Sequence, residues 1–158
     1  MANHISRDIR PADVLALEAE IRYERDCGAI HIHIGLAAES RGRSSKMLAD
    51  ELISHIGLTP LGKDWRGIGR QEAGELITRF LGNGLVFNDP LMPTERAEKL
   101  SASVMALAEP NAAFLTNVCE SDEYNRPGWI SLTNSTFDQG VVFLGKHNSG
   151  IVWVEEED

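Results

Sequence analysis

Residues 141–144 read Val-Val-Phe-Leu, four consecutive apolar positions near the end of a chain of 158 residues. A strand with one face in water alternates apolar and polar residues, because successive side chains point to opposite faces of the sheet. This stretch has no such alternation, and its branched and aromatic side chains favour a strand over a helix. The sequence therefore predicts a central strand that is covered on both faces.

Three other β-rich runs lie near this strand in the last third of the chain. Turn-forming Asn, Asp, Ser, Gly and Pro separate the runs, which cover residues 112–119, 128–133, 140–145 and 150–155. Short strands joined by such turns are typical of an antiparallel meander. Residues 29–36 add an earlier strand, in which three isoleucines alternate with His31 and His33. That alternation predicts a strand with one buried face.

Four stretches before the meander place their apolar residues at helical spacing. They cover residues 11–27, 47–56, 71–81 and 94–108, with Ser44 or Ser45 as the cap of the second. Helices followed by strands predict an α+β fold, with about four helices packed on one face of a mostly antiparallel sheet of four to five strands. The length suits a single domain over 1–158, helix-rich over 1–110 and with the antiparallel meander over 111–158.

The negative charge is unevenly distributed along the chain. Fifteen Lys and Arg stand against 24 Asp and Glu, which gives a net charge of -9 and argues against direct binding to nucleic acid. Residues 81–158 hold 4 basic and 12 acidic residues, so this half carries -8 of the -9. We therefore expect a charged partner to be a basic protein.

The two cysteines, Cys27 and Cys119, do not form the dense disulfide framework of small secreted domains. We find no apolar signal segment at the start and no apolar run near the roughly 20 residues of a membrane-spanning helix. These features predict a cytoplasmic protein with free structural thiols and no membrane association.

The acidic residues of the second half gather near strand ends, with two tryptophans close to them in the sequence. We predict that they form a partner-binding surface, in which opposed charges speed association and the tryptophans anchor the contact. The candidate residues are Glu120, Asp122, Glu123, Trp129, Asp138, Trp153, Glu155, Glu156, Glu157 and Asp158. The simpler interpretation is that the acids only keep the protein soluble and that the tryptophans fill the core.

Catalytic signatures are weak in this sequence. His31 and His33 lie on one face of a strand, about 7 Å apart, and would bind a metal only with a further ligand. Residues 63–69 are interpreted as a flexible connection before a helix, because neither dinucleotide-binding nor P-loop spacing is met; an anion site at Arg66 and Arg70 is the alternative. We expect no catalytic residue, no resident metal and no cofactor, and so not an enzyme.

The end of the chain resembles that of small acidic bacterial proteins that act as immunity proteins against toxins. The resemblance rests on the apolar hairpin of residues 137–154 and on the acidic tail that follows, Glu155 to Asp158. It implies a protein that binds and blocks a cognate toxin. A secretion or assembly chaperone is the alternative, and a metal-dependent enzyme that uses His31 and His33 is the second alternative.

Overall fold

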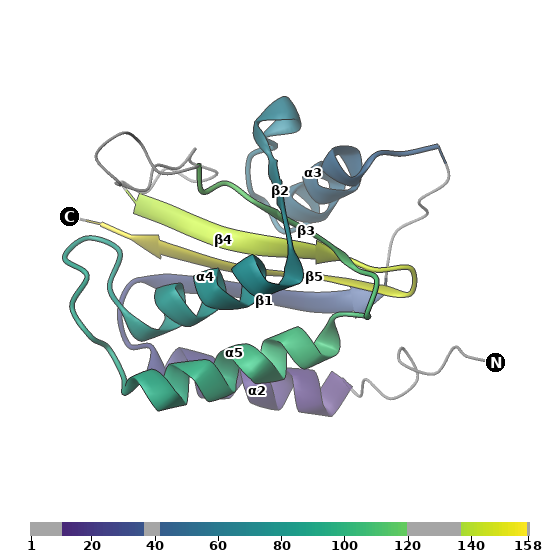
Figure 1. Cartoon of the computed structure of the whole chain (residues 1–158). Coiled ribbons are helices and arrows are strands. Elements are labelled where there is room, and N and C mark those ends of the chain that lie inside the picture. The colour runs from purple at the N-terminus through teal and green to yellow at the C-terminus, as the bar shows by residue number, and fades with distance from the viewer. Residues whose placement is uncertain (1–10, 37–41, 120–136, 158) are drawn as a thin grey trace.

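The computed structural model describes residues 11–36, 42–119 and 137–157 of the chain. It confirms the α+β class, with four α-helices and a five-stranded antiparallel sheet among these residues (Figure 1). The elements are α2 (Pro11–Glu24), β1 (Ala29–Leu36), α3 (Ser45–His55), the 3₁₀ helix η1 (Gly62–Asp64), β2 (Arg66–Ile68), α4 (Arg70–Gly82), α5 (Thr94–Leu107), β3 (Ala113–Thr116), β4 (Phe137–Leu144) and β5 (Asn148–Glu156). None of the described helices is both long and apolar enough to cross a membrane.

The apolar run at 141–144 does lie in the central strand. The strand order is β1-β5-β4-β3-β2, and each neighbouring pair is antiparallel. On β4, Val141 and Phe143 join one apolar cluster, whereas Val142 joins another on the opposite face. All three are at most 1% exposed, so the lack of alternation in the sequence reflects burial on both faces.

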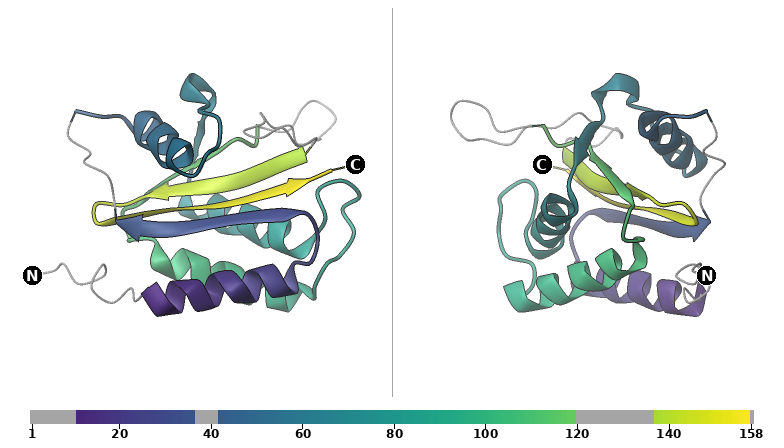
Figure 2. Two further views of the ribbon diagram at one scale, coloured as in Figure 1. Left: turned by 180° about the vertical axis from the view of Figure 1, so that it is seen from behind. Right: turned by 45° about the vertical axis from the view of Figure 1, so that its right-hand side comes forward.

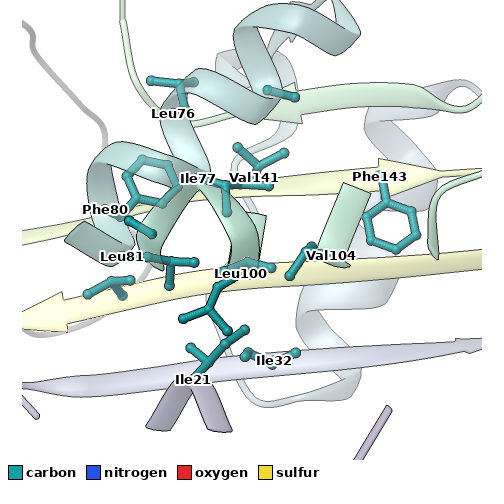
Figure 3. Packing of buried hydrophobic residues seen from close by; sticks show 14 of the residues in the cluster. Ile21, Ile32, Leu76, Ile77, Phe80, Leu81, Leu100, Val104, Val141 and Phe143 are labelled. Carbon is teal, nitrogen blue, oxygen red and sulfur yellow. The ribbon is translucent and has the colours of Figure 1, made fainter. Parts of the chain in front are cut away.

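The larger apolar cluster lies between the sheet and the helices α2, α4 and α5, which cover one face (Figures 1 and 2). Each fully buried Leu, Ile or Phe side chain stabilises the folded state by about 1.5–3 kcal/mol relative to an exposed one. Figure 3 shows its main members, which are Ile21, Ile32, Leu76, Ile77, Phe80, Leu81, Leu100, Val104, Val141 and Phe143.

The expected packing of all helices on one face is wrong in one respect, because α3 covers the other face (Figure 2). Ala49 and Ile53, one turn apart on α3, pack with Val142 and Ile151 of the sheet. The physical reason is the apolar second face of β4 and β5, which needs a cover of its own. The sheet is therefore the middle layer of three.

The predicted elements match the described ones closely. Each of the four expected helices is present within a few residues of its expected bounds, and the Ser44 hydroxyl accepts a hydrogen bond from the Met47 amide at the start of α3. The edge strand β2 was not predicted, because three residues with a central glycine carry no periodicity. The strand expected at 128–133 lies outside the described residues.

A carboxylate on α3 organises the segment that leads to β2. One oxygen of Asp50 accepts hydrogen bonds from the Leu61 amide at 2.9 Å and from the indole Nε1 of Trp65 at 2.8 Å, and the other accepts from the Gly62 amide at 3.0 Å. Trp65 is 2% exposed and its ring meets that of Trp153 edge to face, with centroids 6.0 Å apart. Asp50 thus holds the second apolar cluster against the sheet.

We expect Asp50→Ala to lower the free energy of unfolding by about 3 kcal/mol, because it leaves the indole N–H of the buried Trp65 and the amide of the buried Leu61 without their acceptor. The matched control is Glu51→Ala, which removes an exposed carboxylate paired with Arg43 and should change the value by about 0.5 kcal/mol or less. Urea denaturation of both variants measures the difference. Equal losses would contradict the role given to Asp50.

Candidate functional site

Three segments that are far apart in the sequence meet at one end of the sheet. They are the turn 25–29 between α2 and β1, the loop 83–90 after α4, and residues 154–157, which include the end of β5 (Figure 1, on the side of the C-terminus). Glu155 of β5 pairs with Ala29 of β1 along one edge of the strand and with Asp138 of β4 along the other edge. We call this region the acidic sheet end.

A buried ion pair closes the acidic sheet end. The guanidinium of Arg25, which is 2% exposed, donates to the carboxylate of Glu156, and its Nε donates to the Phe80 carbonyl at 2.6 Å. The same Glu156 oxygen accepts from the Leu85 amide at 2.8 Å. Further donation from Arg25 to the carbonyls of Cys27 and Asn83 joins all three segments.

Gly28 lets the turn approach β5 closely. Its φ of +66° favours glycine, and a Cβ at this position would lie 2.1 Å from the Glu155 carbonyl oxygen and 2.8 Å from Cγ of Glu156. A side chain here would therefore push the turn away from the strand. Glycine at this position thus permits the close approach of the turn that carries Arg25 to the strand that carries Glu156.

The structure corrects the assignment of three predicted partner-binding residues. Trp153 is 0% exposed and packs in the second apolar cluster, so it fills the core. Asp138 is equally buried and accepts a hydrogen bond from Nε1 of Trp153 at 3.4 Å. Glu156, 5% exposed, is bound by Arg25. All three side chains are held inside the chain and are not presented to a partner.

Two predicted residues do reach the surface of the acidic sheet end. Glu157 is exposed, and Glu155 is partly exposed and bonded to Nε2 of His31. The remaining predicted residues, Glu120, Asp122, Glu123, Trp129 and Asp158, lie outside the described residues.

Sequence reasoning missed three exposed residues at this end. Asp26 follows the buried arginine in the turn, and the 83–90 loop exposes Asp89 and also Phe87, whose side chain is 78% exposed. The Asn88-Asp89-Pro90 turn signal marks a surface loop, but nothing in the sequence places that loop beside the last strand. The acidic sheet end thus presents four carboxylates and one aromatic ring.

The thiol of Cys27 lies within this negative environment. Burial raises its pKa above the ordinary value of 9.0, and the negative charge of Glu156 raises it further. A raised pKa keeps the thiol protonated at neutral pH and lowers its nucleophilicity. The geometry therefore favours a structural role for Cys27.

The histidine pair considered as metal ligands and the arginine pair considered for an anion site both have structural surroundings of their own. His31 is bonded to Glu155, His33 is exposed opposite Ile151, and the described ranges contain no group of three side chains suited to a metal ion. Arg66 donates to Glu72 at 2.7 Å and to the Val118 carbonyl at 2.8 Å, and Arg70 binds carbonyls at the end of α5. Both arginines tie elements together.

Comparisons with protein-family models, with curated proteins and with solved structures found no match. The functional argument therefore rests on the geometry of the chain itself.

We expect Glu156→Ala to lower the free energy of unfolding by about 3–5 kcal/mol, because it leaves the Arg25 charge buried without its partner. The neighbouring Glu157→Ala, in an exposed side chain, should change it by about 0.5 kcal/mol or less. Glu156→Gln keeps an acceptor for the Leu85 amide, so its loss in free energy of unfolding should lie between those of the two alanine variants. Chemical denaturation gives all three values, and similar stabilities of the two alanine variants would contradict the structural role of Glu156.

Proposed function

We propose that this chain is a non-enzymatic binding protein that blocks a cognate bacterial toxin through its acidic sheet end. The observation that carries the proposal is that the three segments of the acidic sheet end carry the exposed side chains of Asp26, Asp89, Glu157 and Phe87, together with the partly exposed Glu155. Carboxylates of this kind attract a basic protein surface, and an exposed aromatic ring is a common anchor at the centre of an interface.

The rigidity of this end supports the same proposal. The loop that carries Phe87 and Asp89 is fixed at its start by the bond from the Leu85 amide to Glu156, and by the bond from the Gly84 amide to the Asp89 carbonyl at 2.9 Å. A surface that is already in its bound geometry loses less conformational entropy on association. Such preorganisation suits an inhibitor that must bind its toxin quickly and tightly.

The basic partner is, in this proposal, a toxin domain that acts on nucleic acid. An enzyme that binds a phosphate backbone presents clustered Lys and Arg around its active site. A surface with four carboxylates matches such a cleft in charge and would exclude the substrate from it. The net charge of -9 adds long-range attraction to the same encounter.

One observation favours the chaperone alternative. On α2, Leu15 is 64% exposed and Tyr23 is 84% exposed, and the two residues lie on one side of the helix with the exposed Ala19 between them. An exposed apolar stripe is a contact surface of the kind a chaperone offers to a client. Binding that depends on Leu15 and Tyr23, and not on the acids, would favour this second function.

The test uses the purified product of the adjacent open reading frame, in a catalytically inactivated form, and measures association by surface plasmon resonance. The variant Asp26→Asn/Asp89→Asn/Glu157→Gln removes three exposed carboxylates of the acidic sheet end. We expect its association rate at low salt to fall about tenfold and to depend less on salt than that of the wild type.

The matched control, Asp64→Asn/Glu75→Gln/Glu98→Gln, removes the same charge from exposed acids elsewhere in the described chain. Its rate should stay within about twofold of the wild type, because the attraction between exposed charges is local at physiological salt. Equal slowing of both variants, no binding by the wild type, or an adjacent product that is not a toxin would overturn the proposal.

A further inference from the structure

A second feature borders the acidic sheet end but has the opposite charge. A pocket of about 340 Å³ is lined by Arg79, Asn83, Gly84, Leu85, Asn88 and Gln139. Its residues come from the last turn of α4, the loop that follows and the start of β4. We call it the Arg79 pocket. Its volume falls in the range of small-molecule sites, which begins at about 300 Å³.

Arg79 supplies a cation that is not paired with a carboxylate of the described residues. Its Nη2 donates to the Gln139 side-chain oxygen at 3.2 Å, and it forms no ion pair with any residue in the described ranges. By contrast, Arg25, Arg66 and Arg96 each bind a carboxylate. Burial lowers the pKa of Arg79. A guanidinium has five N–H donors, so most of those on Arg79 remain available.

Gln139 supplies a second donor to the same pocket. The residue is 6% exposed, its oxygen is engaged by Arg79, and its amide Nε2 has no acceptor in the part of the chain that the structure describes. Asn83 and Asn88 add two further side-chain amides. Asn88 adopts a φ of +54°, a conformation that Asn tolerates better than most residues. The lining therefore combines one cation with three neutral amides.

We propose that the Arg79 pocket binds a carboxylate group, either that of a small molecule or that of a polypeptide. Arginine binds a carboxylate through two parallel hydrogen bonds, and side-chain amides complete its coordination. A dianion such as phosphate is disfavoured, because Gly84 of the lining is close to two carboxylates: a Cβ there would lie 2.6 Å from Asp89 Oδ1 and 3.5 Å from Glu156 Oε1. This inference goes beyond the proposed function and does not depend on it.

The experiment titrates the full chain with N-acetylglycine, a small monocarboxylate, and with the peptide acetyl-Gly-Glu-Gly-amide, which offers a side-chain carboxylate. Isothermal calorimetry at pH 7.5 and low salt gives affinities, and NMR of the arginine Nε–H groups identifies the site. We expect at least one of the two probes to bind and to shift the Arg79 signal. The probe that binds more tightly identifies the source of the carboxylate.

Three comparisons make the result specific. The uncharged analogues, N-acetylglycinamide and the Gln peptide, should bind at least tenfold more weakly, and inorganic phosphate should also bind more weakly than the better carboxylate. Arg79→Gln should abolish binding, and Arg79→Lys should weaken it, because lysine cannot form the paired bonds. Arg22→Gln makes the same charge change on the surface of α2 and should leave binding unchanged.

The proposal is overturned if neither carboxylate binds the wild type, if phosphate binds more tightly than both, or if Arg79→Gln and Arg22→Gln weaken binding equally. Circular dichroism measures whether each variant is folded. If Arg79→Gln is unfolded, the weaker binding expected of Arg79→Lys is the test.

Discussion

The guanidinium of Arg25 and the carboxylate of Glu156 meet in the interior, and the arrangement of one whole end of the molecule depends on that contact. They are 131 positions apart in the sequence. The pair fixes the turn before β1, the loop after α4 and the last residues of β5 relative to one another. A buried charge left without its partner costs several kcal/mol, so the three segments are expected to be held together or lost together. The exposed side chains that these segments carry are therefore held in fixed relative positions.

The central strand imposes the second constraint. Because β4 and β5 bury side chains on both faces, the fold needs two apolar layers, and the described helices divide into α2, α4 and α5 on one face and α3 on the other. Gly140 of β4 shows how closely the second layer packs, since a Cβ there would lie 2.2 Å from the ring of Trp153. Asp50 fixes the segment that delivers Trp65 to the same layer. The acidic sheet end that this arrangement leaves exposed is built from a turn, a loop and the end of a strand.

The sequence predicted much of this architecture and little of the site. The run at 141–144 predicted a doubly covered strand, and apolar spacing predicted the four helices. The spacing of Ala49 and Ile53 shows that α3 has an apolar side, but spacing along one helix does not say which face of a sheet that side meets. Glu156 and Glu157 are adjacent identical residues, and in a strand buried on both faces no pattern tells which one is inside. Glu156 is the buried one because it pairs with Arg25, 131 positions away, and a single sequence does not reveal that pairing.

The acidic residues near the end of the chain therefore belong to a surface that three separate segments build. Of the acidic residues in the second half of the chain, the fold buries Glu109, Asp138 and Glu156 and leaves others exposed, among them Asp89 and Glu157. The measurement that tests this account most directly is hydrogen–deuterium exchange of the chain alone and in complex with the adjacent gene product. The account predicts new protection in peptides that cover residues 26–29, 84–90 and 154–157. Protection confined to α2 or α3, with these three segments unchanged, would contradict it.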